Sequence, residues 1–477
     1  MKPDWGSFEE YVQKTMAIYQ VPGLAVAVAR DGEQVYSRGF GWRDRDNQLP
    51  VTEQTVFGIG SITKSFTAVA IMQLEERGKL SVADPVVKYL PEFRVGRGHA
   101  AEAMTIHHFL THTSGLPPLP SLFLCMARSM EGDPAVKEMP FRADCAKQQP
   151  IDTYEQLMEY IANLEVELLG PPGGCFSYSN DAYALLGAII ERVSGQSYQS
   201  YVTENILEPL GMNHTTFDLK VMERYPEVTV LYAQREEQGK EEIFAAPQWW
   251  EAPAMVAAGF LRSNVTDLLR YMEIYRTGGV GNGQRILSAD SVARMTTPFV
   301  ECQPGLYYGY GLMVHPNYHG VSLVEHGGGI KGVSAYVSCV PEKDITGAAL
   351  ANLGQVPSGQ ILLGAMNVLL GLPVGTRRLE YRDYACPAER LGRYEGVYIS
   401  GEGVRCEMAV VDGELHVQLR GKQLRARPVG VDMFTVKMKE EEMLLRFLSD
   451  ARGQVYAAAF GFRIVHRATD HKGQQTA

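Results

Sequence analysis

A serine and a lysine stand three residues apart where the pattern predicts the start of a helix. Ser61 and Lys64 lie in the run Gly-Ser-Ile-Thr-Lys, and apolar residues at helical spacing continue toward Gly78, where a C-terminal cap is expected. Residues i and i+3 share a helix face, so the hydroxyl and the amine can point into the same space. A serine becomes an effective nucleophile when a neighbour takes its proton. The pair predicts such a nucleophile, with an N-capping serine beside a solvated lysine as the alternative.

Two more motifs follow in chain order and supply the other parts of an acyl-transfer site. Tyr178–Asn180 comes after the Pro-Pro-Gly-Gly turn at 171–174 and before a helix expected over 181–194, so it lies on a loop held at both ends. His326–Gly329 follows an expected strand, and its glycines let a substrate backbone approach the strand edge closely. A serine, a lysine, a tyrosine, an amide and a glycine-edged strand together favour serine acyl transfer.

These motifs resemble those of the serine β-lactamase and penicillin-binding protein superfamily, specifically its class C-like branch of DD-peptidases, D-aminopeptidases and family VIII esterases. Ser-x-x-Lys is the first motif of related enzymes, and Tyr-x-Asn is the second motif of this branch. The resemblance covers residues 7–372. The segment after residue 390 is similar to the lipocalin-like β-domains attached to some of these hydrolases. Further matches are Leu110–Leu116, Ala258, Gly259, Ser263, Asp267, Ala351 and Asn352.

The resemblance implies a role for each residue of the three motifs. Ser61 attacks a carbonyl carbon and carries the acyl group. Lys64 and Tyr178 share the removal and return of the proton, each with a pKa lowered by the charge of the other or of a neighbour; which of them is the base stays open. The backbone N–H groups of Ser61 and Gly329 form the oxyanion hole. The residues expected to bind substrate are Asn180, His326, Gly327 and Gly328.

The histidine at position 326 is a departure from the penicillin-hydrolysing class C enzymes, which have a lysine there. A lysine is a permanent cation suited to a β-lactam carboxylate, whereas a histidine with a reference pKa of ~6.5 is only partly charged at neutral pH. We therefore expect a serine hydrolase that cleaves a small peptide, amide or ester through a Ser61 acyl-enzyme, with β-lactams as slow substrates at best. The alternatives are an acyltransferase, or a penicillin-recognising binding or sensor protein with a long-lived acyl-enzyme.

Two other groups of residues are candidates for a site. His108 and His112 stand at i and i+4 beside His107, a spacing that suggests a metal pair. No glutamate stands between them, and His112 belongs to a packing turn of the family that the chain resembles, so we expect neither a metal nor a cofactor. The second group is expected either to line a substrate pocket or to pack in the core: Trp249, Trp250, Met255 and the Pro- and Met-rich excursion 117–150.

Charge and composition exclude several classes of partner. The 477 residues are 45% hydrophobic and 21% charged, as in a soluble globular protein of two or three domains. Residues 381–477 carry 15 basic and 13 acidic side chains, whereas residues 1–380 carry 30 and 42, so this acidic majority argues against nucleic acid and anionic membranes. No apolar run is long enough to span a bilayer. The expected partner is a small-molecule or short-peptide substrate, and a homo-oligomer is compatible with the sequence.

The cysteines and the N-terminus bear on the compartment. The seven cysteines are scattered without a Cys-x-x-Cys pair, which favours free thiols over a disulfide framework. The N-terminus shows no apolar segment with a cleavage site. We expect a cytoplasmic protein, or an extracytoplasmic one if a leader has been removed. A short basic cluster is expected on the exposed face of a hairpin: Arg420, Lys422, Arg425 and Arg427.

The elements expected around the motifs indicate an α+β chain. Residues 1–375 are expected to form a β-lactamase-like domain, with an antiparallel sheet flanked by helices plus an all-helical region. A linker (376–390), a small all-β barrel-like domain (391–468) and a tail (469–477) follow. The expected strands of the sheet are 24–29, 34–39, 307–314, 322–325, 334–340 and 347–352, and the main expected helices are 7–20, 104–110, 153–163, 181–194 and 358–370.

Overall fold

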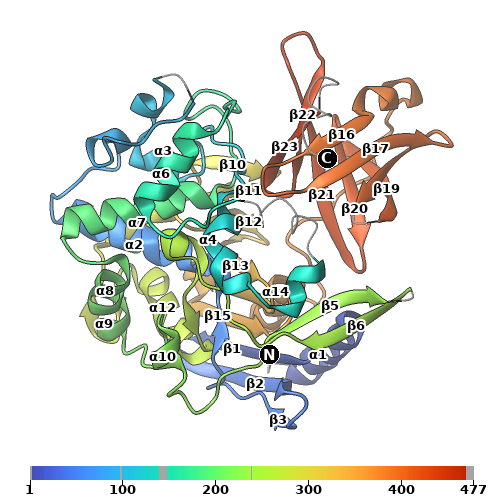
Figure 1. The fold of residues 1–477 in the computed structure, drawn as a ribbon. Helices are drawn as coiled ribbons and strands as arrows, with labels where there is room; N and C mark the ends of the chain where they lie inside the picture. The colour runs from blue at the N-terminus through green and yellow to red at the C-terminus, as the bar shows by residue number, and fades with distance from the viewer. Residues whose placement is uncertain (1–2, 97–98, 139–147, 238, 420, 469–477) are drawn as a thin grey trace.

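A computed structural model describes residues 3–96, 99–138, 148–237, 239–419 and 421–468 of the chain. Helices and strands are interleaved up to residue 370 and form one unit, the body, after which eight strands close into a barrel (Figure 1). The expected α+β architecture with a C-terminal barrel is confirmed. The limits at residues 375 and 391 stay a prediction, and the tail 469–477 lies outside the described residues.

Nine antiparallel strands form the main sheet of the body. The strand β1 (Gly23–Arg30) lies inside this sheet between β2 and β15, and it is buried on both faces. Its valines pack on one face and its alanines on the other, so the pleat delivers large side chains to one layer and small ones to the second. In sheet order the strands are β10 (Val300–Gln303), β11 (Leu306–Tyr308), β12 (Met313–Tyr318), β13 (Val321–Ile330), β14 (Val333–Val340), β15 (Ile345–Ala351), β1, β2 (Glu33–Asp44) and β3 (Leu49–Pro50).

Helices cover both faces of this sheet. The helices α1 (Trp5–Tyr19) and α14 (Ser358–Leu370) pack on the face that carries the valines of β1, and α12 (Val265–Thr277) packs on the other. Beyond α12, α2 (Thr63–Glu76) is buried along most of its length and contacts α7 (Asn180–Ser194). The other helices are α3 (Ile106–Leu110), α4 (Ser121–Met130), α6 (Tyr154–Asn163), α8 (Tyr198–Val202), α9 (Glu208–Leu210), α10 (Leu219–Met222), α11 (Val256–Gly259) and α13 (Ala289–Met295). Three small two-stranded sheets complete the body: β4 (Phe57–Gly58) with β7 (Arg262–Ser263), β5 (Tyr232–Glu237) with β6 (Lys240–Ala245), and β8 (Val280–Gly281) with β9 (Gln284–Arg285).

The structure corrects three of the expected elements. The strand expected over 307–314 is two strands, because the chain turns between Tyr308 and Met313 and these residues pair with each other. The strand expected over 322–325 continues as β13 through the glycines to Ile330. The excursion 117–150 contains the helix α4, in which Leu124 and Met126 are buried.

The barrel has a filled interior. Its core contains Tyr394, Tyr398, Phe434 and Phe447, and the ring centroids of Tyr394 and Phe447 are 4.3 Å apart. Large aromatic side chains stabilise such a small domain by the apolar area that they bury. The barrel strands are β16 (Gly396–Ile399), β17 (Arg405–Val411), β18 (Glu414–Leu419), β19 (Lys422–Gly430), β20 (Met433–Met438), β21 (Glu441–Ser449), β22 (Val455–Phe460) and β23 (Arg463–Arg467).

The segment between body and barrel is pinned to the body. Arg378 lies in the expected linker, and its Nε and Nη2 donate to the two carboxylate oxygens of Glu325 at 2.6 and 2.8 Å. The Glu325 side chain is fully buried, and the Arg378 guanidinium holds the pKa of that carboxyl well below its usual value against the opposing effect of burial. Glu325 directly precedes His326, so this ion pair lies behind one motif of the predicted site.

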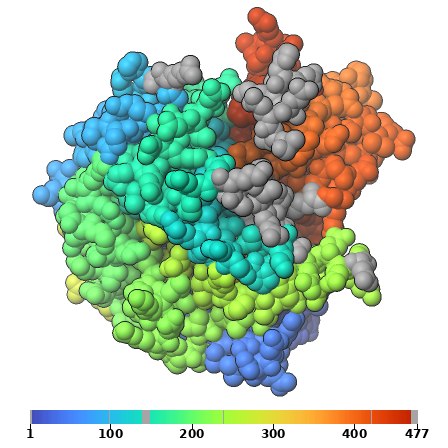
Figure 2. Space-filling model, viewed as in Figure 1, coloured from blue at the N-terminus to red at the C-terminus, as the bar shows by residue number. Residues whose placement is uncertain are grey.

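The barrel also packs directly on the body. A Cβ built on Gly401, in the turn between β16 and β17, would lie 2.5 Å from the backbone oxygen of Pro118. Figure 2 shows the barrel, in orange and red, seated against the teal part of the body. This close contact brings turns of the barrel to the part of the body that precedes α4.

Several expectations about the surface and the thiols can be followed in the structure. The described members of the basic cluster lie on β19, and each has an acidic partner; Arg420 lies outside the described residues. Six cysteines in the described part of the chain are free, and Cys145 lies outside it. None of the described helices is both long and apolar enough to cross a bilayer.

Candidate active site

The predicted nucleophile, Ser61, lies on a tight turn that leads into α2. Gly60–Ile62 form a 3-10 turn, and Ser61 is half-buried within it. Gly60 has a φ of +51°, and a Cβ at this residue would lie 2.7 Å from the backbone nitrogen of Gly329. A glycine is therefore needed here both for the left-handed backbone and for the close approach of β13.

Lys64 is placed by α2 directly against the serine. Its Nζ lies 3.1 Å from Ser61 Oγ, 2.8 Å from Asn180 Oδ1 and 2.6 Å from the backbone oxygen of Ala258. The lysine is fully buried, so the alternative of a solvated lysine is wrong. Its side chain and that of Ser61 point into the same space, as the helical spacing predicted. Burial lowers the pKa of its ammonium well below the usual value, and the nearby charge of Arg463 lowers it further.

These contacts fit either protonation state of the lysine, since an ammonium has three donors for the same three oxygens, and burial favours the neutral amine. A neutral amine has two N–H donors and one lone pair. In the neutral amine, the backbone oxygen of Ala258 and Asn180 Oδ1 accept from the two N–H groups, which leaves the lone pair facing the Ser61 hydroxyl. The geometry thus suits transfer of the serine proton to the amine.

Tyr178 and Asn180 reach the same place from the N-terminus of α7. Ser179 caps this helix by accepting from the backbone N–H of Ala182, and its own N–H donates to His112 Nδ1 at 3.0 Å. The His112 ring packs against the Tyr178 ring with centroids 4.2 Å apart. The histidine therefore supports the loop.

The protonation of Tyr178 differs from the expectation. Burial raises the pKa of the Tyr178 phenol, although a hydrogen bond with Ser61 and the charge of Arg463 act in the opposite direction. The prediction that both helper groups have lowered pKa values is wrong for this residue. Tyr178 is a phenol at neutral pH, and Lys64 is the group whose pKa falls.

The glycines of β13 lie against the nucleophile turn. A Cβ on Gly328 would lie 1.9 Å from the backbone oxygen of Ile59 and 3.2 Å from the backbone nitrogen of Ser61. Gly329 follows, with its nitrogen beside Gly60. The backbone nitrogens of Ser61 and Gly329 therefore both lie where β13 meets the turn that carries Ser61.

His326 is buried and neutral. Its Nδ1 donates to the backbone oxygen of Gly327 at 2.6 Å, so its Nε2 accepts from the Tyr308 hydroxyl at 2.9 Å. Burial lowers the pKa of the ring to about 3, and the charge of Lys64 acts in the same direction. The expectation of a partly charged histidine is wrong, because the reference pKa applies to a solvated ring.

Comparison with known proteins identifies the family to which this chain belongs. The family model described as "Beta-lactamase" matches residues 8–366, which is most of the chain and contains all three motifs. The chain belongs to the β-lactamase family. This assignment agrees with the resemblance inferred from the motifs, and the family model ends before the barrel.

Individual relatives extend the comparison to the barrel. The octameric penicillin-binding protein homologue from Pyrococcus abyssi is 31% identical, with a TM-score of 0.70, covering 97% of this chain and 100% of that one. A D-stereospecific amidohydrolase from Streptomyces is 26% identical, with a TM-score of 0.60, over 76% of this chain and 98% of its own. "Protein flp" of Staphylococcus aureus strain MW2 is 26% identical over 70% of this chain, and the match spans 60% of that longer protein.

The barrel adds residues to the family site that sequence reasoning missed. Glu402, in the β16–β17 turn, accepts from Asn180 Nδ2 at 2.9 Å and from Arg463 Nε. Arg463 lies over the Tyr178 ring with its Cζ 5.0 Å from the centroid, and the backbone oxygen of Phe462 accepts from Tyr178 N at 3.1 Å. In the sequence these residues stand in ordinary hairpin turns, so no motif or periodicity marks them.

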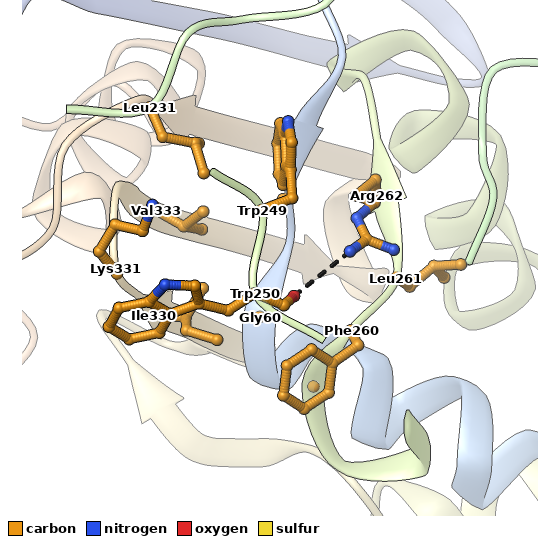
Figure 3. Close-up of a pocket in the computed structure, with 12 residues that line it drawn as sticks. Gly60, Leu231, Trp249, Trp250, Phe260, Leu261, Arg262, Ile330, Lys331 and Val333 are labelled. Atoms are coloured by element: carbon orange, nitrogen blue, oxygen red, sulfur yellow. Dashed lines mark hydrogen bonds between the residues drawn. The ribbon is translucent and has the colours of Figure 1, made fainter. Parts of the chain in front are cut away.

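A pocket borders the family's nucleophile turn at Gly60 (Figure 3). Its two cations are already partnered: Arg262 donates to the backbone oxygen of Trp250 at 3.4 Å, and Lys331 Nζ lies 2.7 Å from Asp133. The pocket therefore presents a mainly apolar lining. Its apolar residues include Trp249, Trp250, Phe260, Leu261, Ile330 and Val333.

The remaining candidates have structural partners. Met255 is fully buried in the core of the body. His107 Nδ1 lies 2.8 Å from the Tyr310 hydroxyl, and His108 Nδ1 accepts from the backbone N–H of Thr105 at 3.1 Å. Within the described residues, no three His, Cys, Asp or Glu side chains gather as a metal site would need.

Proposed function

We propose that this protein hydrolyses small amides, peptides or esters through an acyl-enzyme on Ser61. The observation that carries the proposal is the Lys64 amine, buried and 3.1 Å from Ser61 Oγ, with two other acceptors occupying its N–H groups. A buried neutral amine can take the serine proton at the moment of attack. Lys64 is therefore the base of this proposal.

The steps follow from the positions of the groups. Ser61 Oγ bonds to the carbonyl carbon while its proton moves to Lys64 Nζ, and the N–H groups of Ser61 and Gly329 stabilise the oxyanion. The bond from carbon to the leaving nitrogen or oxygen then breaks, and Tyr178 gives its proton to the leaving group while the Lys64 ammonium reprotonates the phenolate. Water attacks the acyl-enzyme by the reverse route and releases the acid. Removing one oxyanion donor costs ~3–4 kcal/mol in enzymes of this kind.

Two observations bear on the substrate. His326 is neutral with both ring nitrogens bound inside the protein, so it supplies no cation for a β-lactam carboxylate. The pocket beside Gly60 has an apolar lining whose cations are partnered, which suits an uncharged side chain on the acyl group. A similar protein acts as a D-stereospecific amidohydrolase. We therefore infer D-residue amides and small esters as substrates, with β-lactams acylating slowly.

The experiment is active-site labelling followed by a substrate panel. A serine-directed phosphonate should add one label to Ser61, detected by mass spectrometry, and Ser61→Ala should prevent it. Nitrophenyl esters and D- and L-amino-acid anilides should turn over, while a chromogenic cephalosporin should turn over far more slowly. Turnover retained in Ser61→Ala contradicts the proposal. A lasting label with a β-lactam but no ester or amide turnover instead favours a penicillin sensor, and product formed on an added amine favours an acyltransferase.

We also propose that the chain assembles as a homo-oligomer. The support is the octameric protein of Pyrococcus abyssi, which is similar over 97% of this chain, barrel included. Size-exclusion chromatography with light scattering should give a mass several times that of one chain. A monomer at micromolar concentration contradicts this proposal without affecting the proposed chemistry.

A further inference from the structure

Two turns of the barrel enter the active site of the body. The turn between β16 and β17 carries Glu402, and the turn between β22 and β23 carries Phe462 and leads into Arg463. Phe462 packs beside the cluster that contains Tyr178 and Tyr308, and Figure 1 shows β23 next to β10 and β11. The barrel therefore directly borders the predicted catalytic groups.

Glu402 determines how the Asn180 amide is turned. An asparagine amide can be placed in two orientations, and its neighbours decide between them. Glu402 is a carboxylate that only accepts, so Asn180 must present its Nδ2 to it, at 2.9 Å. The amide oxygen then points to Lys64 Nζ, at 2.8 Å. Among the barrel residues that the structure describes, Glu402 is the one that bonds to the Asn180 amide.

Arg463 in turn holds Glu402. Its Nε donates to the second carboxylate oxygen, while its guanidinium rests on the Tyr178 ring. The Glu402 side chain is 8% exposed and that of Arg463 is 31% exposed, so the pair lies at the inner wall of the site. A chain of contacts therefore runs from Arg463 through Glu402 and Asn180 to Lys64.

We propose that Glu402 and Arg463 are positioning residues through which the barrel completes the catalytic site. Glu402 fixes the Asn180 amide so that its oxygen receives Lys64, and Arg463 fixes Glu402. One N–H of the Asn180 amide remains for a substrate carbonyl. This inference rests on the proposed function, since it takes Lys64 as the base.

The two charges also act on Lys64 with opposite signs. Glu402 raises the pKa of the lysine, and Arg463 lowers it. The charged and titratable groups that face Lys64 from the other elements are Asp181 on α7, whose charge raises the pKa, the rings of Tyr178 and Tyr183, and the neutral rings of His112 and His326. Removing one charge of the barrel pair should therefore shift the lysine titration in a direction set by the charge removed.

The test measures kcat/KM for a nitrophenyl ester against pH in four variants of the full chain. Glu402→Ala should lower kcat/KM about 100-fold, the loss typical of a misplaced catalytic group, and Glu402→Gln should recover most of it because its amide oxygen still accepts from Asn180. The matched control is Lys439→Ala, which removes a barrel-to-body ion pair with Glu241 (2.8 Å) outside the site. The control should leave kcat/KM within about twofold of the unmodified protein.

The pH profile separates positioning from a structural role. Activity needs neutral Lys64, so Glu402→Gln should move the acid limb of kcat/KM to lower pH, and Arg463→Gln should move it to higher pH. The direction of each pH shift does not depend on the fraction of the variant that is folded. The melting temperature measures that fraction's stability separately. Shifts in the same direction, unshifted limbs, or a Glu402→Ala activity equal to that of Lys439→Ala overturn the inference. Phosphonate labelling of Ser61 in the unmodified protein then shows whether the proposed function itself still stands.

Discussion

In the body, the predicted reactive groups lie on α2 and on the turns that lead into α2 and α7, whereas in the barrel Glu402 lies on a hairpin turn and Arg463 at the first residue of a strand. Lys64 is fully buried on α2 with three partners at 2.6 to 3.1 Å. Arg463 is about one-third exposed and reaches the site from the start of β23. Rigid elements place atoms more accurately than turns do. In the proposed mechanism, the body therefore supplies the reacting groups, and the barrel supplies groups that orient them.

Body and barrel also differ in how a side chain added at a tightly packed glycine would affect the site. Gly60 and Gly328 in the body allow two backbones to meet beside the nucleophile, and neither position has room for a side chain. In the barrel, Gly401 plays a similar part against Pro118, but there the contact joins two units and leaves the nucleophile untouched. The same substitution should therefore have different consequences in the two halves.

The largest effect is expected where the chain passes from body to barrel. Arg378→Met leaves the Glu325 carboxylate fully buried without its cation, and losing one partner of a buried pair costs about 3–5 kcal/mol. Denaturant unfolding should show this loss. Arg425→Met is the matched control on the barrel, where arginine and glutamate are both exposed, and about 0–1 kcal/mol is expected. Equal losses of unfolding free energy in both variants would mean that the buried ion pair contributes no more to stability than the exposed one.

The next effect tests the body half. In Gly328→Ala, the new Cβ would meet the backbone oxygen of Ile59 at 1.9 Å, so β13 must move away from the nucleophile turn. We expect kcat/KM for an ester substrate to fall by about 100-fold or more, because the oxyanion donors lose their placement. Gly375→Ala, whose Cβ has no neighbour within 4 Å, is the control. Unchanged kinetics in Gly328→Ala would remove β13 from the site.

A smaller effect is expected from the equivalent change in the barrel. Gly401→Ala places a Cβ 2.5 Å from the backbone oxygen of Pro118, which should displace the turn that carries Glu402. We expect kcat/KM to fall about tenfold. Ser61 and Lys64 keep their positions in the body, and only the Asn180 amide that Glu402 orients is held less firmly. Steady-state kinetics with the same ester measure this. A loss as large as that of Gly328→Ala would show that the two halves contribute equally.

The effect that is smallest for a single pH unit concerns the pH dependence of stability. The pKa of Lys64 is lower in the folded chain than in the unfolded one, so below its ordinary value near 10.5 the unfolded state binds a proton that the folded state does not. Stability due to Lys64 therefore falls as the pH falls from about 10 toward the folded pKa, by at most about 1.4 kcal/mol per pH unit. Lys64→Met lacks this slope, and unfolding curves of both proteins across pH 7–10 should diverge. Parallel pH dependence would contradict a neutral lysine in the body half.

Much of the body could be predicted from its sequence, because its patterns are local. The hairpin of β1 and β2, the helix α7 closed by Gly195 and the helix α14 follow from apolar periodicity and turn residues. The course of β13 through Gly327–Gly329 was not predicted, since glycines weaken a strand in isolation. Pairing with β14 and the close approach of Ile59 hold those residues extended.

In the candidate site, too, some features could be predicted from the sequence and others could not. Ser61, Lys64, Tyr178 and Asn180 were predicted as a group, and the structure brings them together. The charge states were not predicted correctly for Tyr178 and His326, because burial outweighs the neighbouring groups that a sequence displays. The oxyanion roles and the substrate contacts of the glycines stay predictions.

The sequence by itself determined the reactive groups of this protein and the order in which they occur, because a Ser-x-x-Lys turn and a capped Tyr-x-Asn loop are local structures. Only the tertiary structure decided which helper group has a lowered pKa, since the burial of Lys64 and its contact with Ala258 depend on segments about two hundred residues apart. It also decided that Glu402 and Arg463 belong to the site. Their place there arises from the packing of the barrel on the body, and a hairpin turn carries no local sign of what it will contact.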